Sequence, residues 1–250
     1  MSHTRCARRG RGGGTVTPVA TSTLVKGARS TRSTVALKLL MAVSGLIFIG
    51  FLLIHMYGNL KVFAGHDAFN EYAHHLRTFG EPMLPYGGLL WIIRVTLIAA
   101  LVAHVSSAVM LTIRAGKART TKYAVKKNLA SSLSSRTMRW GGLALFIFVI
   151  WHLIHFTIGK VNPTGGATND PYQLVVDSFG LWWMVLIYLA ALVAVGLHLH
   201  HGTWSAMQTL GLTGSPRARS RAKAAGLVIA VLIAGGFALV PLSVLFGIVA

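Results

Sequence analysis

Residues 143–158 read LALFIFVIWHLIHFTI, an almost entirely apolar run that contains His152 and His155. An imidazole in such a run has no water to bond, and ionisable groups inside a membrane span are costly and usually have a partner or a function. Three further apolar runs also carry histidine. These histidines are His55, His104 and the cluster His198, His200 and His201.

The composition is that of a membrane protein, because 54% of the residues are hydrophobic and only 12% are charged, against about 25% charged residues in soluble domains. Cys6 is the only cysteine, which excludes an internal disulfide framework and any multi-cysteine metal or iron–sulfur site. The 11 histidines remain, so a metal or haem site must use nitrogen ligands. The net charge of +19 comes from basic residues that flank apolar spans, so we expect no nucleic-acid partner.

The sequence predicts an all-α integral membrane bundle of five transmembrane helices. Each of five apolar runs is long enough to cross about 30 Å of hydrocarbon at 1.5 Å per residue, and none shows the alternation of a barrel strand. A basic, disordered cytoplasmic tail, residues 1–33, is expected before a five-helix domain, residues 34–250. The runs cover residues 35–60, 86–114, 138–159, 179–206 and 222–249.

The charges predict the orientation. The tail through Lys38 carries eight Lys or Arg residues, the 114–139 connection eight and the 207–223 connection four, whereas the other two connections together carry three. Because cytoplasmic connections hold the excess of Lys and Arg, we predict a cytoplasmic N-terminus and a C-terminus outside. The acidic residues lie in or beside the two outer connections: Asp67, Glu71, Glu81, Asp170 and Asp177.

The two outer connections differ in pattern. The first places apolar residues at helical spacing and predicts a short helix in the outer interface, with Asp67 capping its start. The second, 160–178, contains Asn-Pro, Gly-Gly and Asp-Pro, which predict turns. The helical stripe of the first consists of Phe69, Tyr72, Leu76 and Phe79.

Depth sorts the histidines into two pairs. At 1.5 Å per residue, His55 lies about 25–30 Å and His152 about 20 Å above the inner end of its span. On the same scale His104 lies about 15 Å and His198 about 12 Å above the inner end of its own span. The sequence thus predicts an outer pair on spans 1 and 3 and an inner pair on spans 2 and 4.

Four intramembrane histidines paired by depth favour two bis-histidine b haems, although a lone one is often only a helix–helix hydrogen bond. A bis-histidine haem needs a neutral imidazole on each face, oriented through its other nitrogen, and room for a flat macrocycle. Small neighbours provide that room: Gly45, Gly50, Ala99, Ala100, Ala103, Ser106, Ser107, Ala194 and Gly196.

The roles of the other polar residues in the spans are less specific. His155 can replace His152 as ligand, bond a haem propionate or serve a structural role. His200 and His201 lie nearer the inner boundary and fit an interfacial role. Arg94 either snorkels to the outer interface or pairs with propionates of the outer haem. Span 5 has no histidine and is expected to serve packing.

The chain resembles the cytochrome b membrane anchor of succinate dehydrogenases and fumarate reductases, in the single-subunit, five-helix, two-haem form. The resemblance covers about residues 35–249 and implies the same ligand pairs, with His152 rather than His155 as ligand. Its signs are HMYGN at 55–59, His104 in span 2, WH at 151–152 and HLHHGTW at 198–204.

The resemblance implies a succinate:quinone oxidoreductase subunit of the tricarboxylic acid cycle, in the plasma membrane of a bacterium. Electrons would come from an iron–sulfur protein that is docked with a flavoprotein on the cytoplasmic side, and would pass through the two haems to quinone, expected to be menaquinone. Succinate would be oxidised in the flavoprotein, and quinone reduced in or beside this chain. The basic inner connections suit such docking, and equally suit anionic lipid.

The acidic residues suggest where quinone is reduced. Some fumarate-reducing relatives use a transmembrane glutamate for proton movement, but none of the five spans here contains Glu or Asp. Because the acidic residues lie in or beside the outer connections, we expect quinone reduction near the outer haem. Asp67, Glu71 and Glu81 are candidates to line that site, and the alternative is that they are solvated loop charges.

Two other classes of protein compete with this interpretation. Cytochrome b subunits of hydrogenases and formate dehydrogenases are also histidine-rich bundles, but the alternating pairing and the histidine-free fifth span argue against them. The second class is a transporter or a purely structural scaffold, and the near absence of membrane carboxylates and of paired broken helices argues against transport.

Overall fold

The computed structural model describes residues 33–118, 133–158 and 168–250, and within these ranges the chain is helical without strands. Five helical segments are long and apolar enough to cross a membrane, which confirms the all-α, five-span fold. The predicted tail lies outside the described residues except for Ser33. The elements are α1 (Thr34–Leu60), η2 (Lys61–Ala64), α2 (His66–Thr78), α3 (Gly88–Lys117), α4 (Leu133–His152), η3 (Leu153–Ile158), α5 (Pro171–Phe179), α6 (Trp182–Thr209) and α7 (Pro216–Leu245).

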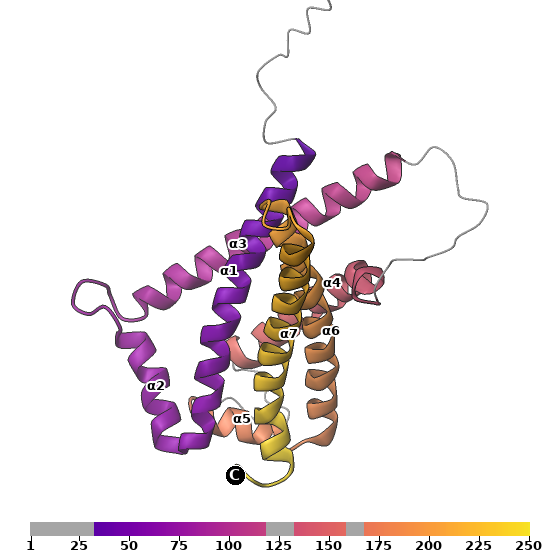
Figure 1. The fold of residues 1–250 in the computed structure, drawn as a ribbon. Helices are drawn as coiled ribbons and strands as arrows, with labels where there is room; N and C mark the ends of the chain where they lie inside the picture. Colours follow the sequence, from indigo (N-terminus) through magenta and orange to yellow (C-terminus); the bar gives the residue numbers. More distant parts are fainter. Residues whose placement is uncertain (1–32, 119–132, 159–167) are drawn as a thin grey trace, which may run out of the picture.

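The two ends of the bundle differ in charge. The start of α1, the end of α3 and the turn between α6 and α7 lie at the upper end in Figure 1, and α2, α5 and the C-terminus lie at the lower end. The upper end thus carries basic residues of α3 and α7, and the lower end carries the acidic residues of α2 and α5. This segregation is what the predicted orientation requires, while the side that faces the cytoplasm stays a prediction.

The lower connections contain one helix that the sequence analysis placed and one that it missed. Helix α2 forms as predicted, but Gly65 rather than Asp67 is its N-cap residue. The prediction of turns was wrong for Asp170-Pro171, because Asp170 accepts a hydrogen bond from the backbone N–H of Gln173 and Pro171 occupies the first turn of α5. The turns predicted at Asn162-Pro163 and Gly165-Gly166 lie outside the described residues. Asp followed by Pro is also a favourable helix start, since Pro needs no partner for its missing N–H.

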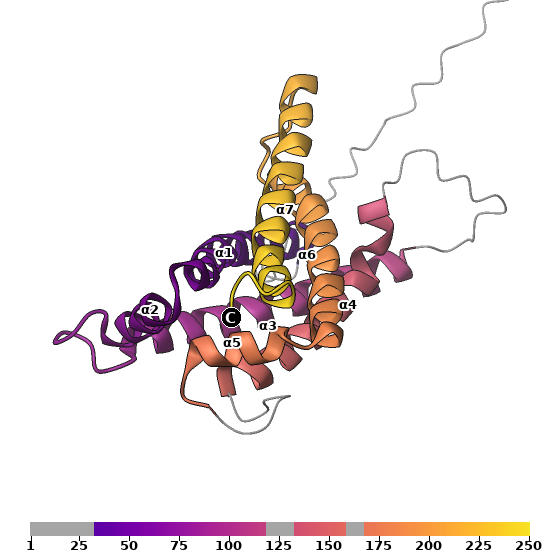
Figure 2. The same cartoon turned by 90° about the horizontal axis from the view of Figure 1, so that it is seen from below.

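The buried core lies where α5, α6 and α7 meet the end of η2. Met184 and Val185 of α6 and Val240 of α7 are almost completely buried there. Helices α6 and α7 run side by side in both views (Figures 1 and 2), and a second core cluster lies between them around Ile233. Outward faces of the long helices remain exposed and apolar, as in Ile98 and Val231, which suits contact with lipid.

Helices α6 and α7 lie in close contact at Gly226. A Cβ atom there would lie 2.7 Å from the backbone oxygen of His200, so the two backbones would have to separate. Small residues allow such close contact between membrane helices. We expect Gly226→Ala to lower the free energy of unfolding in detergent by about 1–3 kcal/mol. Gly235→Ala on the same helix is the control, because its Cβ atom meets no atom within 4 Å. Equal stability of the two variants would contradict the packing described here.

The chain repeats one arrangement twice. The segments α1–α2–α3 and α4–α5–α6 each consist of a long helix, a short helix and a second long helix. In the first half Gly45 precedes His55 by ten residues, and in the second Gly142 precedes His152 by ten residues. His55 and His152 therefore hold equivalent places in the two halves, as do His104 on α3 and His198 on α6.

Candidate functional site

The structure brings the four intramembrane histidines together in two pairs, each with one imidazole from either half of the chain. The ring centres of His55 and His152 lie 5.9 Å apart and are nearly perpendicular, at 83°. The ring centres of His104 and His198 lie 6.1 Å apart at an interplanar angle of 56°. These are the pairs that the depth of each residue along its span predicts.

The separation of the rings suits a metal between them. Two imidazole nitrogens that bind one metal from opposite faces, at about 2 Å each, lie about 4 Å apart and place their ring centres roughly 6 Å apart. Both pairs are close to this value. A direct hydrogen bond between two imidazoles is the competing explanation, but neither pair shows one within the described parts of the chain.

The helices that carry the paired histidines make little contact with each other. Helix α1 packs against α3, α6 and α7, and α4 packs against α6, whereas α1 against α4 and α3 against α6 are not packed along their lengths. The imidazoles thus extend from different helix pairs toward a shared space. Such an arrangement can accommodate a flat group between the two halves.

Ser44 orients one imidazole of the inner pair. Its hydroxyl lies within hydrogen-bond distance of the backbone oxygens of Leu40, at 2.8 Å, and Met41, at 3.1 Å, and its oxygen lies 3.1 Å from Nδ1 of His104. When the serine proton is donated to one of these carbonyls, Nδ1 of His104 carries its own proton and donates it to Ser44. The other nitrogen, Nε2, then keeps a free lone pair, the form that a metal-binding histidine needs.

Glycine lies beside each imidazole of the inner pair. A Cβ atom on Gly45 would lie 3.6 Å from Cε1 of His104, and one on Gly142 would lie 3.6 Å from Cε1 of His198. Nδ1 of His198 is buried and has no hydrogen-bond partner among the described residues. Buried polar atoms nearly always have a partner, so the partner of this nitrogen lies outside the described residues.

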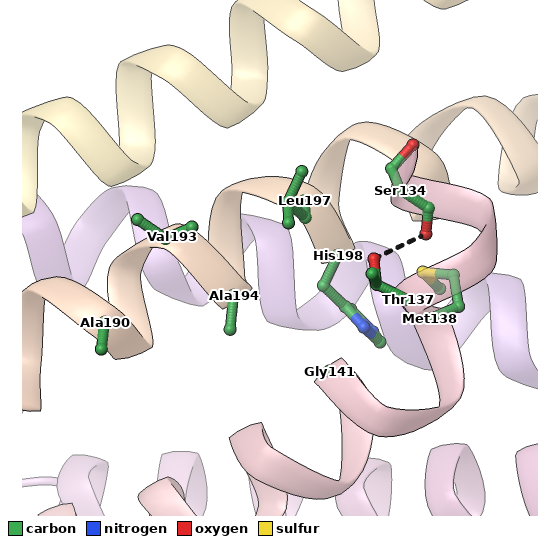
Figure 3. Close-up of a pocket in the computed structure, with 9 residues that line it drawn as sticks. All are labelled: Ser134, Thr137, Met138, Gly141, Ala190, Val193, Ala194, Leu197 and His198. Atoms are coloured by element: carbon green, nitrogen blue, oxygen red, sulfur yellow. Dashed lines mark hydrogen bonds between the residues drawn. The ribbon is translucent and has the colours of Figure 1, made fainter. Parts of the chain in front are cut away.

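A cavity of about 160 Å³ lies between α4 and α6 beside the inner pair. In Figure 3, His198 extends from α6 toward Gly141 of α4, and Ala194 faces the same space. Thr137 donates to the backbone oxygen of Ser134 at 3.3 Å, which satisfies the hydroxyl without filling the cavity. The lining is mostly apolar and small, and it leaves space beside His198.

The outer pair is enclosed by aromatic side chains. His55 stacks on Phe51 at 5.2 Å, and His152 stacks on Phe148 at 5.9 Å. The side-chain nitrogen of Asn59 lies 3.5 Å from Nε2 of His55, too far for a strong hydrogen bond, and donates instead to the backbone oxygen of His55 at 2.8 Å. Nε2 of His55 is therefore still available to a metal.

Both nitrogens of His155 already have protein partners. Its side chain is completely buried, with Nδ1 3.1 Å from the hydroxyl of Tyr188 and Nε2 2.9 Å from the hydroxyl of Ser178. The π-helical turn η3 begins directly after His152 and contains His155, and such turns are frequent at functional sites. These contacts favour a structural role for His155 over ligation or a propionate contact.

The remaining predicted site residues lie away from the two imidazole pairs. Arg94 stacks over the exposed ring of Trp91 at 5.1 Å, as expected of a side chain that snorkels. Asp67, Glu71 and Glu81 are exposed, and of these Asp67 bonds His66. Two further histidines lie near the upper end of α6: His201 lies 6.1 Å from the ring of Trp204, and His200 places its backbone against Gly226.

A polar cluster that the sequence analysis missed ties α2 to α5. Nε2 of His66 lies 2.7 Å from Asp170 and Nδ1 lies 2.9 Å from Asp67. Hydrogen bonds to Asp67 and then to Asp170 raise the pKa of His66 above its usual value. Burial by itself would raise the pKa of Asp170, but hydrogen bonds from the backbone of Gln173, from Asn70 and from His66 lower it to about 2.

This cluster makes the α2–α5 contact pH dependent. The contribution of His66 is fully present below its unfolded pKa near 6.5 and is lost as the pH rises through its higher folded pKa. The contribution of Asp170 is present above 3.8 and is lost as the pH falls toward about 2. We expect the thermal stability of the detergent-solubilised protein to fall above neutral pH in the wild type but not in His66→Gln. A parallel fall in both proteins would exclude His66 as the cause, and His74→Gln is the control.

The sequence analysis also missed four residues around the imidazole pairs: Ser44, Gly142, Ser178 and Tyr188. A search for internal repetition would have found Gly142, since it precedes His152 as Gly45 precedes His55. Tyr188 and Ser44 were visible as polar residues within apolar spans. Only the fold shows which histidines they contact.

In comparisons with protein-family models, with curated proteins and with solved structures, nothing matches this chain.

Proposed function

We propose that this chain is a dihaem cytochrome b that anchors a succinate:quinone oxidoreductase in the membrane. In this proposal His55 and His152 hold the outer haem, and His104 and His198 hold the inner one. The observation that carries the proposal is the presence of two imidazole pairs at ring separations of 5.9 and 6.1 Å, each formed across two helices. Bis-histidine ligation within a helix bundle has this arrangement of ligands.

The residues of the chain itself hold and orient the cofactors. Haem iron supplies reversible one-electron chemistry when bound, and the protein adjusts it through ligand orientation and burial. Ser44 keeps the proton of His104 on Nδ1, and Gly45 and Gly142 leave space beside the inner imidazoles. Phe51 and Phe148 stack on the imidazoles of the outer pair.

The role as an anchor is supported by the charges and by the resemblance in sequence. Basic residues of α3 and α7 gather at one end of the bundle (Figure 1) and provide a surface for partner subunits. The segment HLHHGTW at 198–204, together with His55, His104 and His152, resembles succinate dehydrogenase anchors. In this proposal a flavoprotein and an iron–sulfur protein bind at the basic end, and quinone, expected to be menaquinone, accepts electrons near the outer pair.

Purification of the tagged chain from its native membrane tests the anchor role. We expect a flavin-containing subunit and an iron–sulfur subunit to purify with it. We also expect the purified complex to reduce an added menaquinone analogue when succinate is supplied. Purification with a nickel or molybdenum protein instead would assign the chain to the hydrogenase or formate dehydrogenase class. A chain with haem but no partner subunits would refute the anchor role and leave the cytochrome assignment intact.

A further inference from the structure

A network of hydrogen bonds, the longest of which is the 3.4 Å link between Tyr188 and His152, connects the outer imidazole pair to a backbone carbonyl on α5. The hydroxyl of Tyr188 lies 3.4 Å from Nδ1 of His152 and 3.1 Å from Nδ1 of His155. Nε2 of His155 lies 2.9 Å from the hydroxyl of Ser178, which lies 2.5 Å from the backbone oxygen of Leu174. The network thus links side chains of α4, η3, α5 and α6.

The carbonyl at the end of the network fixes where each proton lies. A carbonyl oxygen only accepts, so the hydroxyl of Ser178 donates to Leu174 and its oxygen accepts from Nε2 of His155. A neutral His155 then has a bare Nδ1, which accepts from the hydroxyl of Tyr188. The oxygen of Tyr188 in turn accepts from Nδ1 of His152, and Nε2 of His152 is left with its lone pair.

We infer that Tyr188 is a positioning residue that holds His152 in its metal-binding tautomer, with His155 and Ser178 fixing the direction of the hydrogen bonds. The inference rests on the proposed function, because the lone pair on Nε2 is directed to a haem iron only if that haem is bound. It assigns His155 a role other than ligation, and it explains why a histidine three residues from a ligand is completely buried.

The surroundings of the network make one proton arrangement strongly preferred. Phe156 lies 4.2 Å from the ring of His155, and Phe179 and Phe148 lie 5.0 and 5.1 Å from the ring of Tyr188. In such buried surroundings each unsatisfied donor or acceptor costs free energy, and each hydrogen bond of the network strengthens its neighbour. A charged His155 would be costlier still in this apolar region.

The two haems would therefore have ligands oriented in different ways. Ser44 donates to Leu40 and accepts directly from His104, whereas Ser178 donates to Leu174 and acts on His152 only through His155 and Tyr188. Hydrogen bonds from the second nitrogen make an imidazole ligand more basic. Greater basicity favours ferric over ferrous iron, so the network lowers the reduction potential of the outer haem.

The test is redox titration and low-spin EPR spectroscopy of the haem-loaded wild type and of Tyr188→Phe, with haem quantified per chain. The outer haem is identified as the one lost in His55→Ala. We expect Tyr188→Phe to retain both haems and to shift the reduction equilibrium of the outer haem about fivefold toward the ferrous form. That shift is about 40 mV, since tenfold is 59 mV for one electron. The EPR signal of the outer haem should move and that of the inner haem should not.

Ser178 provides a second test at a residue with no contact to His152. Ser178→Ala should shift the outer haem in the same direction, and Ser178→Thr, which keeps the hydroxyl, should restore the wild-type potential. Ser243→Ala is the control, because this buried serine also donates to a carbonyl of its own helix, that of Val240. An outer haem unchanged in both Tyr188→Phe and Ser178→Ala would overturn the inference alone, whereas a wild type without haem would overturn the proposed function.

Discussion

Replacing His152 or His55 by alanine is expected to reduce the haem content of the purified protein from two per chain to one, with loss of the outer haem. His104→Ala or His198→Ala is expected to remove the inner haem instead. In the proposed function each haem would take one imidazole from each half of the chain, and the ring centres of the two pairs lie 5.9 and 6.1 Å apart. Without one of its two imidazoles, a bis-histidine site cannot form.

Haem extraction with quantification per chain, together with EPR spectra that separate the two haems, measures this result. His74→Ala is the control, since His74 is exposed on α2. Retention of two bis-histidine haems in His152→Ala would contradict the assigned pairing. Both nitrogens of His155 are already hydrogen-bonded to protein groups, which argues against His155 replacing His152 as ligand.

A bulky residue at Gly45 should remove the inner haem and spare the outer one. A Cβ atom at this position already comes within 3.6 Å of His104, so the branched end of leucine in Gly45→Leu would occupy the space of the imidazole. Close-packed interiors tolerate such added volume poorly. We expect the haem content to fall to one per chain while the helical circular dichroism remains unchanged.

Gly235→Leu is the control, because Gly235 also lies in a membrane-spanning helix and its Cβ atom would meet no atom within 4 Å. Gly142→Leu should act as Gly45→Leu does, since Gly142 holds the equivalent position beside His198. If Gly235→Leu and Gly45→Leu lose the same haem to the same extent, the loss does not come from the space beside His104.

The pairing of the histidines could be predicted from sequence because it depends on quantities that sequence contains. The length of each span gives the depth of a residue, and the distribution of Lys and Arg gives the direction of each crossing. Helix α5 was missed because Asp170-Pro171 begins a turn and a helix equally well, and only the downstream packing of Val175 and Phe179 decides between them. The local sequence alone therefore does not decide between a turn and a helix at this position.

The residues around the imidazoles could not be predicted for a different reason. Ser178 and Tyr188 contact His155 from helices 23 and 33 residues away, and no local pattern signals such a contact. The cluster of His66 and Asp170 likewise joins residues 104 positions apart. Periodicity predicts which face of a helix is apolar, but it does not predict which side chain of another helix lies opposite a given polar group.

The central claim is that two bis-histidine haems lie between the two halves of this chain. A dithionite-reduced minus oxidised visible spectrum of the purified chain, with haem and protein quantified in the same sample, tests it most directly. We expect two low-spin b haems per chain. A purified, folded chain whose spectrum contains no haem would contradict it, and the four histidines would then be assigned to contacts between helices.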